Sequence, residues 1–283
     1  MGAPIKIINE SEFNIRADVL LANHYPKYSR AALAKLFNMQ KISMDGKPIK
    51  AGERIRPNIS IDADISDLTK PVDGIELPII YEDENVIVIN KPAGVISHAR
   101  GKYWDEPSVA SFVRSRVSDM FGERAGIVHR LDRATSGVMI CAKNPQTLSF
   151  LQKQFSDRKV TKTYIAQTEK APNPESGIID IPLARNPNKP QTFMVSPNGK
   201  SSQTEYHTIE QSADRATIKL HPLTGRSHQL RVHLKHLGRP IIGDDLYRGK
   251  PADRLYLHAE SLEITLPGGK KEVFNAPLPK EMK

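Results

Sequence analysis

The 283-residue chain contains one cysteine, Cys141, and one tryptophan. A single cysteine excludes an intramolecular disulfide and any zinc or iron–sulfur site built from several cysteines. No apolar run reaches the roughly 18 residues needed to span a bilayer, and the N-terminus lacks the basic stretch and apolar block of a secretory signal. These absences predict a soluble protein of a reducing compartment, the cytoplasm.

The sequence also lacks the usual cofactor and metal motifs. No G-x-G-x-x-G follows a predicted strand, so a Rossmann-type site is not supported. Gly199-Lys200-Ser201 has the ending of a phosphate-binding loop, but Met194 occupies the position of its first glycine. Four histidines lie close together in sequence: His221, His228, His233 and His236. Their spacing does not match a zinc-binding helix, so we expect hydrogen-bonded or phosphate-facing histidines, no metal and no cofactor.

Positive charge is in excess, with 41 Lys and Arg against 32 Asp and Glu, for a net charge of +9. Residues 27–56 hold eight basic and two acidic residues, a net charge of +6 and two-thirds of the excess. Such a segment favours a polyanionic partner such as nucleic acid, although its lysines can also simply keep a helical hairpin solvated. The candidate RNA-binding side chains are Lys27, Arg30, Lys35, Lys41 and Lys47.

The basic segment is also expected to be folded. Asp18 is placed to cap a short helix and Ser29 to cap a second one. Apolar residues within 33–37 follow the i, i+3, i+4 spacing of one buried face, and Asp45-Gly46 predicts a tight hairpin turn. Residues 61–76, with acidic and turn residues, are interpreted as a linker.

Length favours two domains, and we place them at residues 1–72, including the linker, and at 78–283. In the second, residues 86–89 form a continuous β-branched run that indicates a strand buried on both faces. Further strands are predicted near residues 127–128, 138–142, 161–167, 203–210, 216–220, 255–266 and 272–274. Asn144-Pro145 begins one helix, and a second is capped by Ser227 and closed by Gly238. This pattern predicts an α+β domain on a mixed, mainly antiparallel sheet with flanking helices.

The residues most suggestive of chemistry lie in the loop between the predicted strands at 127–128 and 138–142. There Asp132 lies between Arg130 and Arg133, followed by small turn residues. The carboxylate can serve catalysis, or it can cap a turn through the amides of Thr135 or Ser136 with both arginines on the surface. The neighbouring His129 is expected to position the loop rather than to react.

Residues 129–137, His-Arg-Leu-Asp-Arg-Ala-Thr-Ser-Gly, resemble the signature loop of the RluA-type pseudouridine synthases, which isomerise uridine in structured RNA. Further similar blocks follow in the family's order at 81–94, 162–164, 223–231, 243–247 and 257–259, so the resemblance covers most of 78–277. Residues 16–56 resemble the small RNA-binding domain of ribosomal protein S-four type. There Ala17 lies between two charged residues where that family usually has leucine.

The resemblance implies a role for each of four side chains. Asp132 is the expected nucleophile, and Arg226 its expected ionic partner. Tyr164 is expected to stack on the uracil and to help remove the C5 proton. Arg130 is expected to fill the space left by the extruded uridine or to clamp the backbone; a surface ion pair is its alternative. Because the reaction breaks the N1–C1′ bond and rejoins the base through C5, it needs no redox cofactor. The motif does not decide whether Asp132 attacks C6 or C1′.

The resemblance also implies an RNA partner, with large-subunit ribosomal RNA favoured and transfer RNA as the alternative. A non-catalytic RNA-binding assembly factor on the same fold would be expected to lack Asp132, Tyr164 or Arg226, and all three are present. A methyltransferase would need a glycine-rich cofactor loop, which is missing. The sequence does not fix the oligomeric state, for which a monomer is favoured.

Overall fold

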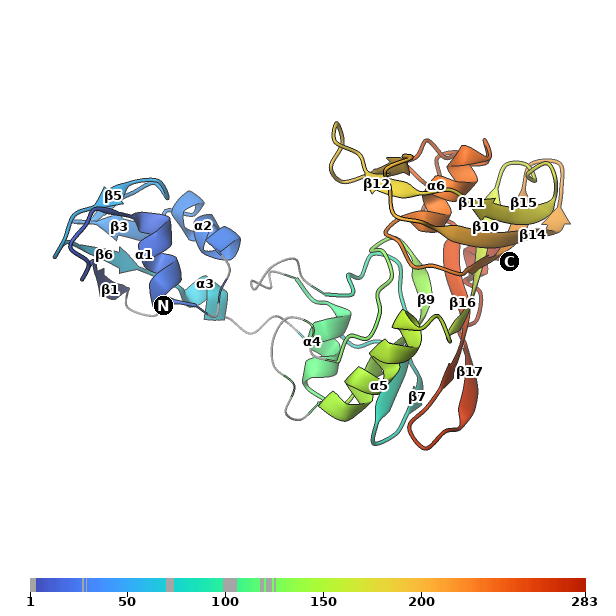
Figure 1. The fold of residues 1–283 in the computed structure, drawn as a ribbon, viewed down its shortest axis with the longest axis horizontal. Helices are drawn as coiled ribbons and strands as arrows, with labels where there is room; N and C mark the ends of the chain where they lie inside the picture. The colour runs from blue at the N-terminus through green and yellow to red at the C-terminus, as the bar shows by residue number, and fades with distance from the viewer. Residues whose placement is uncertain are drawn as a thin grey trace. The chain divides into compact units, whose positions relative to one another are not determined.

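The computed structural model describes residues 4–26, 28, 30–69, 74–98, 106–117, 120, 124 and 126–283. The chain divides into two compact units, Met1–Ile75 with His98–Pro107, and Glu76–Ser97 with Ser108–Lys283. Figure 1 labels their elements. This division differs from the predicted domains in grouping 98–107 with the first unit. Within the described ranges, no helix is long and apolar enough to cross a membrane.

The first unit packs short helices against a small sheet. Its elements are β1 (Ile5–Ile8), β2 (Ile15–Arg16), α1 (Ala17–His24), α2 (Arg30–Asn38), β3 (Ile42–Met44), β4 (Lys47–Pro48), β5 (Arg54–Ile55), β6 (Ser60–Ala63) and α3 (Ser66–Thr69). The sheet has the order β1-β6-β3-β4. Leu21, Leu33, Ile42 and Ile61 are fully buried in its core. The two helices and the β3–β4 hairpin follow the apolar spacing and the turn seen in the sequence.

Two expectations for this unit were wrong. Asp18 does not cap α1, because the helix begins at Ala17 with Arg16 at its N-cap, and the Asp18 carboxylate pairs with Arg16 and Arg30 instead. Residues 61–76 are not all linker, since they include most of β6 and the whole of α3. The apolar residues at 61 and 63 alternate with polar ones and pair antiparallel with β1 and β3, a strand pattern that the acidic residues obscured. The proposed cap Ser29 lies outside the described residues.

The second unit is built on one large sheet. Its elements are β7 (Ile79–Glu82), β8 (Val86–Lys91), α4 (Val109–Arg114), β9 (Ser136–Ala142), α5 (Pro145–Ser156), β10 (Thr161–Thr168), β11 (Ser176–Asp180), β12 (Leu183–Arg185), β13 (Phe193–Val195), β14 (Gln203–Gln211), β15 (Ala216–Pro222), α6 (Gln229–His236), β16 (Leu257–Thr265), β17 (Lys271–Asn275) and the 3₁₀ turn η1 (Lys280–Met282). The sheet runs β11-β14-β15-β10-β16-β9-β8-β7, with β17 on β16, and β12 pairs with β13 separately. Only β9 and β16 pair in parallel among the described strands. The predicted α+β class and mainly antiparallel sheet are confirmed.

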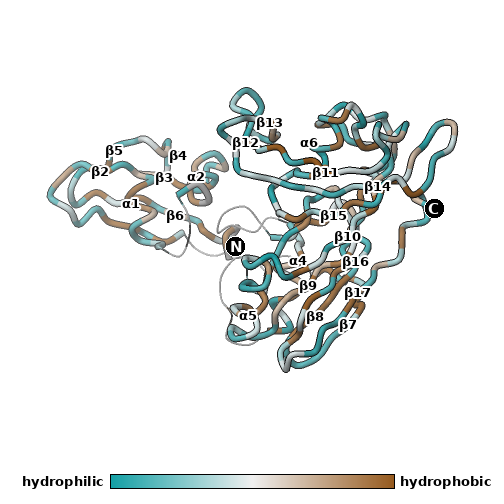
Figure 2. Tube along the Cα trace, turned by 45° about the vertical axis from the view of Figure 1, so that its right-hand side comes forward, coloured by the Kyte–Doolittle hydropathy of each residue, from teal (hydrophilic) through white to brown (hydrophobic). Residues whose placement is uncertain are grey.

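Local signals placed several elements of this unit correctly. β8 is buried on both faces as predicted, and Figure 2 colours most of it as hydrophobic. Asn144 caps α5 by accepting a hydrogen bond from the Thr147 N–H at 2.9 Å. Ser227 does not cap α6, because His228 takes the N-cap position with a left-handed backbone, φ 56°. Residues 127–128 form only an isolated bridge through Ile127, not a strand.

Candidate active site

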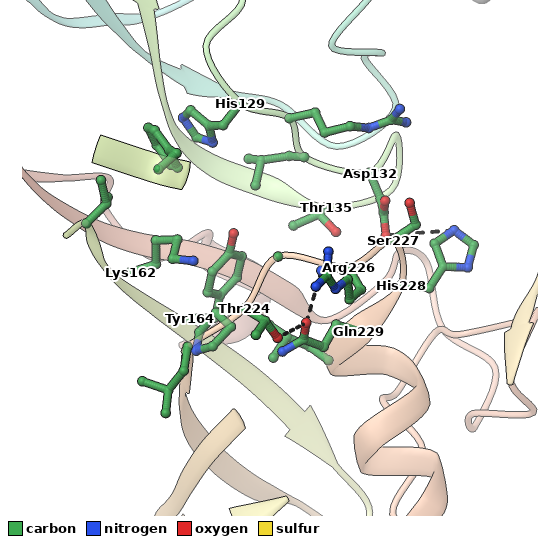
Figure 3. A pocket seen from close by; sticks show the side chains of 18 of the residues that line it. His129, Asp132, Thr135, Lys162, Tyr164, Thr224, Arg226, Ser227, His228 and Gln229 are labelled. Carbon is green, nitrogen blue, oxygen red and sulfur yellow. Dashed lines mark hydrogen bonds and ion pairs between the residues drawn. The ribbon is translucent and has the colours of Figure 1, made fainter. Parts of the chain in front are cut away.

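A pocket of about 540 Å³ opens in the second unit, where the loop before β9, strand β10 and the turn before α6 meet (Figure 3). Its lining includes all four side chains that the sequence singled out in this unit: Arg130, Asp132, Tyr164 and Arg226. They come from segments nearly a hundred residues apart. A volume of this size lies within the roughly 300–1,000 Å³ of small-molecule sites and suits one nucleotide.

The loop that carries Asp132 is fixed on both sides of that residue. The Ser97 hydroxyl donates to the carbonyl of Leu131 at 2.8 Å and accepts from its N–H at 3.1 Å. The Gly94 N–H donates to the carbonyl of Arg133 at 2.8 Å. With both neighbours held, the Asp132 side chain, 21% exposed, has little freedom beyond its own χ angles.

The turn after Asp132 does not use its carboxylate as a cap. The Thr135 N–H donates to the main-chain carbonyl of Asp132 at 3.1 Å, and the described residues form no hydrogen bond from a turn amide to the side chain. The turn-capping alternative is therefore wrong, and the carboxylate is left for the pocket. Gly137 follows where β9 crosses β16 so closely that a Cβ would collide with the Ala259 main chain, and its φ of +120° also requires glycine.

Lys91, at the end of β8, is a site residue that we did not predict. Its side chain is fully buried, and its Nζ donates to the carbonyls of Pro92 and Val95 at 2.8 Å and of Arg133 at 3.3 Å. Burial lowers the pKa of Lys91 to about 7, against the attraction of Asp132. The lysine thus ties the Asp132 loop to the turn after β8. The sequence signal that could have identified Lys91 was a lysine at the end of a strand that is otherwise mostly apolar and buried.

Two cationic or polar groups approach the Asp132 carboxylate, both from α6 and its N-cap. Oδ2 lies 3.7 Å from Arg231 Nη1 and 3.8 Å from His228 Nε2. Arg231 is buried and forms two hydrogen bonds with the fully buried side chain of Asp244, at 2.8 and 2.7 Å. This bidentate pair orients the guanidinium toward Asp132.

The predicted pairing of Arg226 with Asp132 is wrong. The Arg226 Nε donates instead to the Ser201 carbonyl at 3.1 Å, and its side chain is exposed at the pocket rim. Arg226 belongs to the turn before α6, whereas Arg231 lies inside the helix. The spacing of His228 and Arg231, three residues apart, places both on one side of the helix and was the signal that could have identified them.

The turn that carries Arg226 is held by Gln229. Its Oε1 accepts from the Thr224 hydroxyl at 2.7 Å and from the Arg226 N–H at 3.0 Å. Its Nε2 donates to the Gln203 carbonyl and the Thr204 hydroxyl, both at 2.9 Å. The amide is buried with its partners satisfied, so the turn enters the pocket as a rigid unit.

Tyr164 extends from β10 into the pocket, with its ring partly buried (Figure 3). Its neighbour Ile165 points to the other face and is buried in the core, as the strand period predicts. Burial, with the charge of Asp132 as a smaller cause, raises the pKa of Tyr164. The phenol is therefore protonated at neutral pH.

The remaining predicted residues differ in their surroundings. Arg130 is exposed at the pocket and has no ion pair or hydrogen bond with any described residue, so its surface ion-pair alternative is not seen. His129 accepts from the Ile140 N–H at 3.1 Å and stacks on Phe155, which confirms its positioning role. His233 bonds the hydroxyls of Thr204 and Ser202.

The basic residues of the first unit are partly neutralised. Arg30 pairs with Asp18 at 2.6 Å and Lys41 with Asp64 at 2.7 Å. Lys35 and Lys47 are exposed, and Lys27 lies outside the described residues.

A mixed sheet that gathers a carboxylate, an aromatic ring and several guanidinium groups around one nucleotide-sized pocket defines an enzyme built to act on a nucleotide. The chain matches the family described as RNA pseudouridylate synthase over residues 85–236, which include the Asp132 loop and α6. The chain belongs to this family and is an RNA pseudouridine synthase.

Known relatives agree with this assignment. The chain is 36% identical to the ribosomal large subunit pseudouridine synthase D of Borreliella burgdorferi, over 94% of this chain and 87% of that protein. It is 41% identical to the dual-specificity RNA pseudouridine synthase RluA of Escherichia coli, over 71% of this chain and 93% of the relative. Among solved structures, human RNA pseudouridylate synthase domain containing 1 superposes with a TM-score of 0.61 at 26% identity, covering 74% of this chain and 86% of that one.

Proposed function

We propose that this pseudouridine synthase modifies uridines of large-subunit ribosomal RNA in the cytoplasm, with Asp132 as its nucleophile. The observation that carries the proposal is a carboxylate on a loop fixed at both neighbouring residues, with a cation and an aromatic ring beside it in the pocket. The relative that this chain matches over 94% of its length is named for the large ribosomal subunit, which supports that target.

The pocket can accept the uridine only after the base leaves its stack, at a cost of a few kcal/mol. Arg130, exposed and without a described partner, is free to occupy the vacated space or to bind a phosphate. Tyr164 offers its ring to the extruded uracil, and stacking of this kind contributes about 1–3 kcal/mol per base. The raised pKa of Tyr164 favours stacking over proton removal by a phenolate.

Asp132 then makes the covalent bond. Arg231 Nη1 lies 3.7 Å from Oδ2 of Asp132, so its positive charge attracts the carboxylate and helps to position it. The carboxylate adds to the nucleoside and later leaves, the N1–C1′ bond breaks, the uracil turns, and the C5–C1′ bond forms. C5 loses its proton and N1 gains one, so atoms and electrons balance. The same carboxylate serves attack at C1′ or at C6.

The first unit is proposed as an RNA-binding accessory domain of ribosomal protein S-four type. Its two helices and hairpin carry the exposed Lys35 and Lys47, and Lys and Arg side chains of this kind bind phosphates irrespective of base sequence. The proposed contribution of the unit is affinity, while the chemistry belongs to the second unit.

The Asp132→Asn variant tests the nucleophile. We expect it to abolish pseudouridine formation, because the amide cannot add and leave as a carboxylate does. Carbodiimide-dependent primer-extension stops in RNA from cells complemented only by the variant provide the measurement. Asp245→Asn, an exposed carboxylate of the same unit, is the matched control and should behave as wild type. Tyr164→Leu in the same assay tests stacking and should reduce the stops. Stops of wild-type strength with Asp132→Asn would contradict the proposal.

A further inference from the structure

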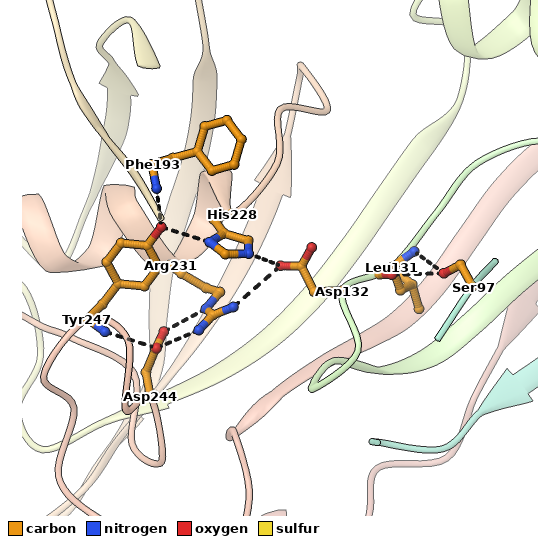
Figure 4. A network of polar contacts seen from close by, with 8 residues as sticks. All are labelled: Ser97, Leu131, Asp132, Phe193, His228, Arg231, Asp244 and Tyr247. Atoms are coloured by element: carbon orange, nitrogen blue, oxygen red, sulfur yellow. Dashed lines mark hydrogen bonds and ion pairs between the residues drawn. The ribbon is translucent and has the colours of Figure 1, made fainter. Parts of the chain in front are cut away.

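Behind Asp132, a short chain of polar contacts leads away from the pocket through His228 to Tyr247 (Figure 4). The Tyr247 hydroxyl oxygen lies 2.8 Å from the main-chain nitrogen of Phe193 and 2.8 Å from Nδ1 of His228. On its other side, His228 Nε2 lies 3.8 Å from Asp132 Oδ2. All four residues belong to the second unit, and His228 and Tyr247 are partly or wholly buried.

The contact between Phe193 and Tyr247 determines which group donates in the hydrogen bond between Tyr247 and His228. The Phe193 N–H can only donate, so the Tyr247 oxygen accepts from it. The Tyr247 O–H has one hydrogen of its own, and within the described residues Nδ1 of His228 is its only acceptor. Tyr247 therefore donates to Nδ1, and Nδ1 carries no hydrogen. A neutral imidazole with a bare Nδ1 bears its hydrogen on Nε2, the nitrogen that faces Asp132.

The backbone at His228 is one of six described non-glycine positions with a positive φ. His228 has φ 56° and ψ 16°, a left-handed conformation that a non-glycine residue adopts only at some cost. No side-chain capping hydrogen bond of α6 accounts for it. Its ring lies edge-on to both Phe193 and Tyr247, with centroids 5.5 and 5.6 Å away. Such a conformation persists where surrounding contacts hold it, and here the rings of Phe193 and Tyr247 and the hydrogen bond to Tyr247 do so.

Both neighbours of the carboxylate approach the same oxygen. Arg231 Nη1 and His228 Nε2 both make their closest approach to the carboxylate at Oδ2, at 3.7 and 3.8 Å. A carboxylate held through one oxygen presents the other to the substrate. The arrangement therefore distinguishes two chemically equivalent atoms.

We propose that Tyr247 locks His228 in the neutral tautomer with its hydrogen on Nε2, and that this N–H and Arg231 together hold Oδ2 of Asp132 so that Oδ1 is the attacking oxygen. His228 is a positioning residue, and the inference rests on the proposed role of Asp132. A neutral N–H orients the carboxylate without forming a full ion pair, which preserves its nucleophilicity more than a second cation would.

The charged groups around His228 and its burial determine at which pH it stays neutral. Burial lowers the pKa of His228, the carboxylates of Asp132 and Asp244 act to raise it, and the guanidinium groups of Arg231 and Arg130 act to lower it. Burial raises the pKa of Tyr247 to about 12, so Tyr247 keeps its hydrogen at neutral pH. Protonation of Nδ1 would also leave the Tyr247 O–H without an acceptor. His228 is therefore neutral at pH 7.

Nitrogen-15 NMR of the full chain with labelled histidine reads the tautomer directly. At pH 7 we expect His228, identified by the signals lost in His228→Gln, to show the Nε2–H neutral form. Tyr247→Phe should shift it toward a tautomer mixture and raise its pKa, because Nδ1 loses its donor. Tyr256→Phe, whose hydroxyl bonds Asp253 away from the pocket, is the matched control and should leave the signals unchanged. An Nδ1–H tautomer or an imidazolium in the wild type would overturn the proposal.

Single-turnover kinetics test the consequence for the rate. His228→Leu removes the N–H and should slow the rate at saturating RNA by about 100-fold, the usual effect of losing one oriented donor, with little change in the RNA concentration for half-maximal rate. His228→Gln keeps an N–H at a similar reach and should recover much of that loss. In Tyr247→Phe the acid limb of the pH–rate profile should move to higher pH, because His228 now protonates more easily. An unshifted limb, or equal rates for the leucine and glutamine variants, would contradict the positioning role.

These outcomes separate the two proposals. If Asp132→Asn forms pseudouridine normally, the nucleophile assignment fails whatever the NMR shows. If Asp132→Asn is inactive and His228 bears its hydrogen on Nδ1, only the tautomer lock fails.

Discussion

The two arginines flanking the start of α6 show how differently one residue type serves a site. Arg231 is 5% exposed and is held by two hydrogen bonds with Asp244, whereas Arg226 is exposed and bonds one carbonyl. A planar guanidinium can satisfy Asp244 bidentately and still direct its remaining nitrogen to Asp132, which a lysine ammonium cannot reproduce. The contacts of Arg231 therefore depend on the planar shape of its guanidinium group.

Arg231→Lys should lower the single-turnover rate at saturating RNA by roughly tenfold or more, because it keeps the charge but loses the bidentate geometry. Arg226→Lys is the matched control and should change that rate by no more than a few-fold. Circular dichroism melting checks that both variants fold, since a weakened partner for buried Asp244 also costs stability. Equal rates for the two variants would contradict the assignment of Arg231 as the partner of Asp132.

Among the elements of the first unit, α1 and α2 are held together by an ion pair as well as by the apolar core. Asp18 in α1 pairs with Arg16, which precedes that helix, and with Arg30, which begins α2. The hydrogen bond from Arg16 is the largest of the causes that lower the pKa of Asp18 to about 2, and burial opposes it. A carboxylate whose pKa is lowered by folding stabilises the fold above its unfolded pKa and loses that contribution as pH falls through the folded value.

Asp18→Asn should therefore lower the opening free energy of α1 and α2 by roughly 1–2 kcal/mol at pH 7. The difference from wild type should shrink as pH falls from about 4 to about 2, where the wild-type carboxyl also becomes neutral. This difference in opening free energy is measured by hydrogen exchange of peptides covering residues 17–38, with the exchange rates corrected for intrinsic exchange at each pH. Asp45→Asn, an exposed turn residue, is the control. A difference that stays constant with pH would exclude the ion pairs as its cause.

For the molecule as a whole, we propose that the first unit contributes affinity for RNA and that the second unit carries out the reaction. Every pocket-lining residue belongs to the second unit, and two-thirds of the excess positive charge belongs to residues 27–56. Arg30 and Lys41 are paired with acids, so the charge available to phosphates is smaller than the sequence count. Binding that depends on phosphate contacts weakens with salt in proportion to the contacts made.

Deletion of residues 1–72 should weaken RNA binding and make its salt dependence shallower, with the log–log slope reduced by roughly 1 to 3. Titrations of a fluorescent ribosomal RNA fragment at several salt concentrations provide the slopes. The truncated chain should keep weak pseudouridine formation, which confirms that its second unit is folded. An unchanged slope would contradict the proposed role of the first unit.

How much of the site was predictable depends on whether its signal was local. The Asp132 loop and Tyr164 were identified from short motifs that resemble those of the family, and the Asn144 cap from a local capping pattern. The ionic partner of Asp132 was misassigned because Arg226 and Arg231 belong to the same motif. Only the position at which α6 begins decides which of them faces Asp132. That start depends on a left-handed His228, a conformation that local propensity disfavours and that only surrounding contacts can impose.

The fold class, the family and the carboxylate that we propose as nucleophile could all be inferred from the sequence alone, because apolar periodicity and a contiguous motif are properties of neighbouring residues. Which groups surround that carboxylate could not be inferred in this way, because they are brought together only when the chain folds. His228 and Arg231 approach the carboxylate from a helix N-cap and a helix, at 3.8 and 3.7 Å, and Tyr247, from a loop, contacts His228 in turn at 2.8 Å. These distances exist only in the folded chain.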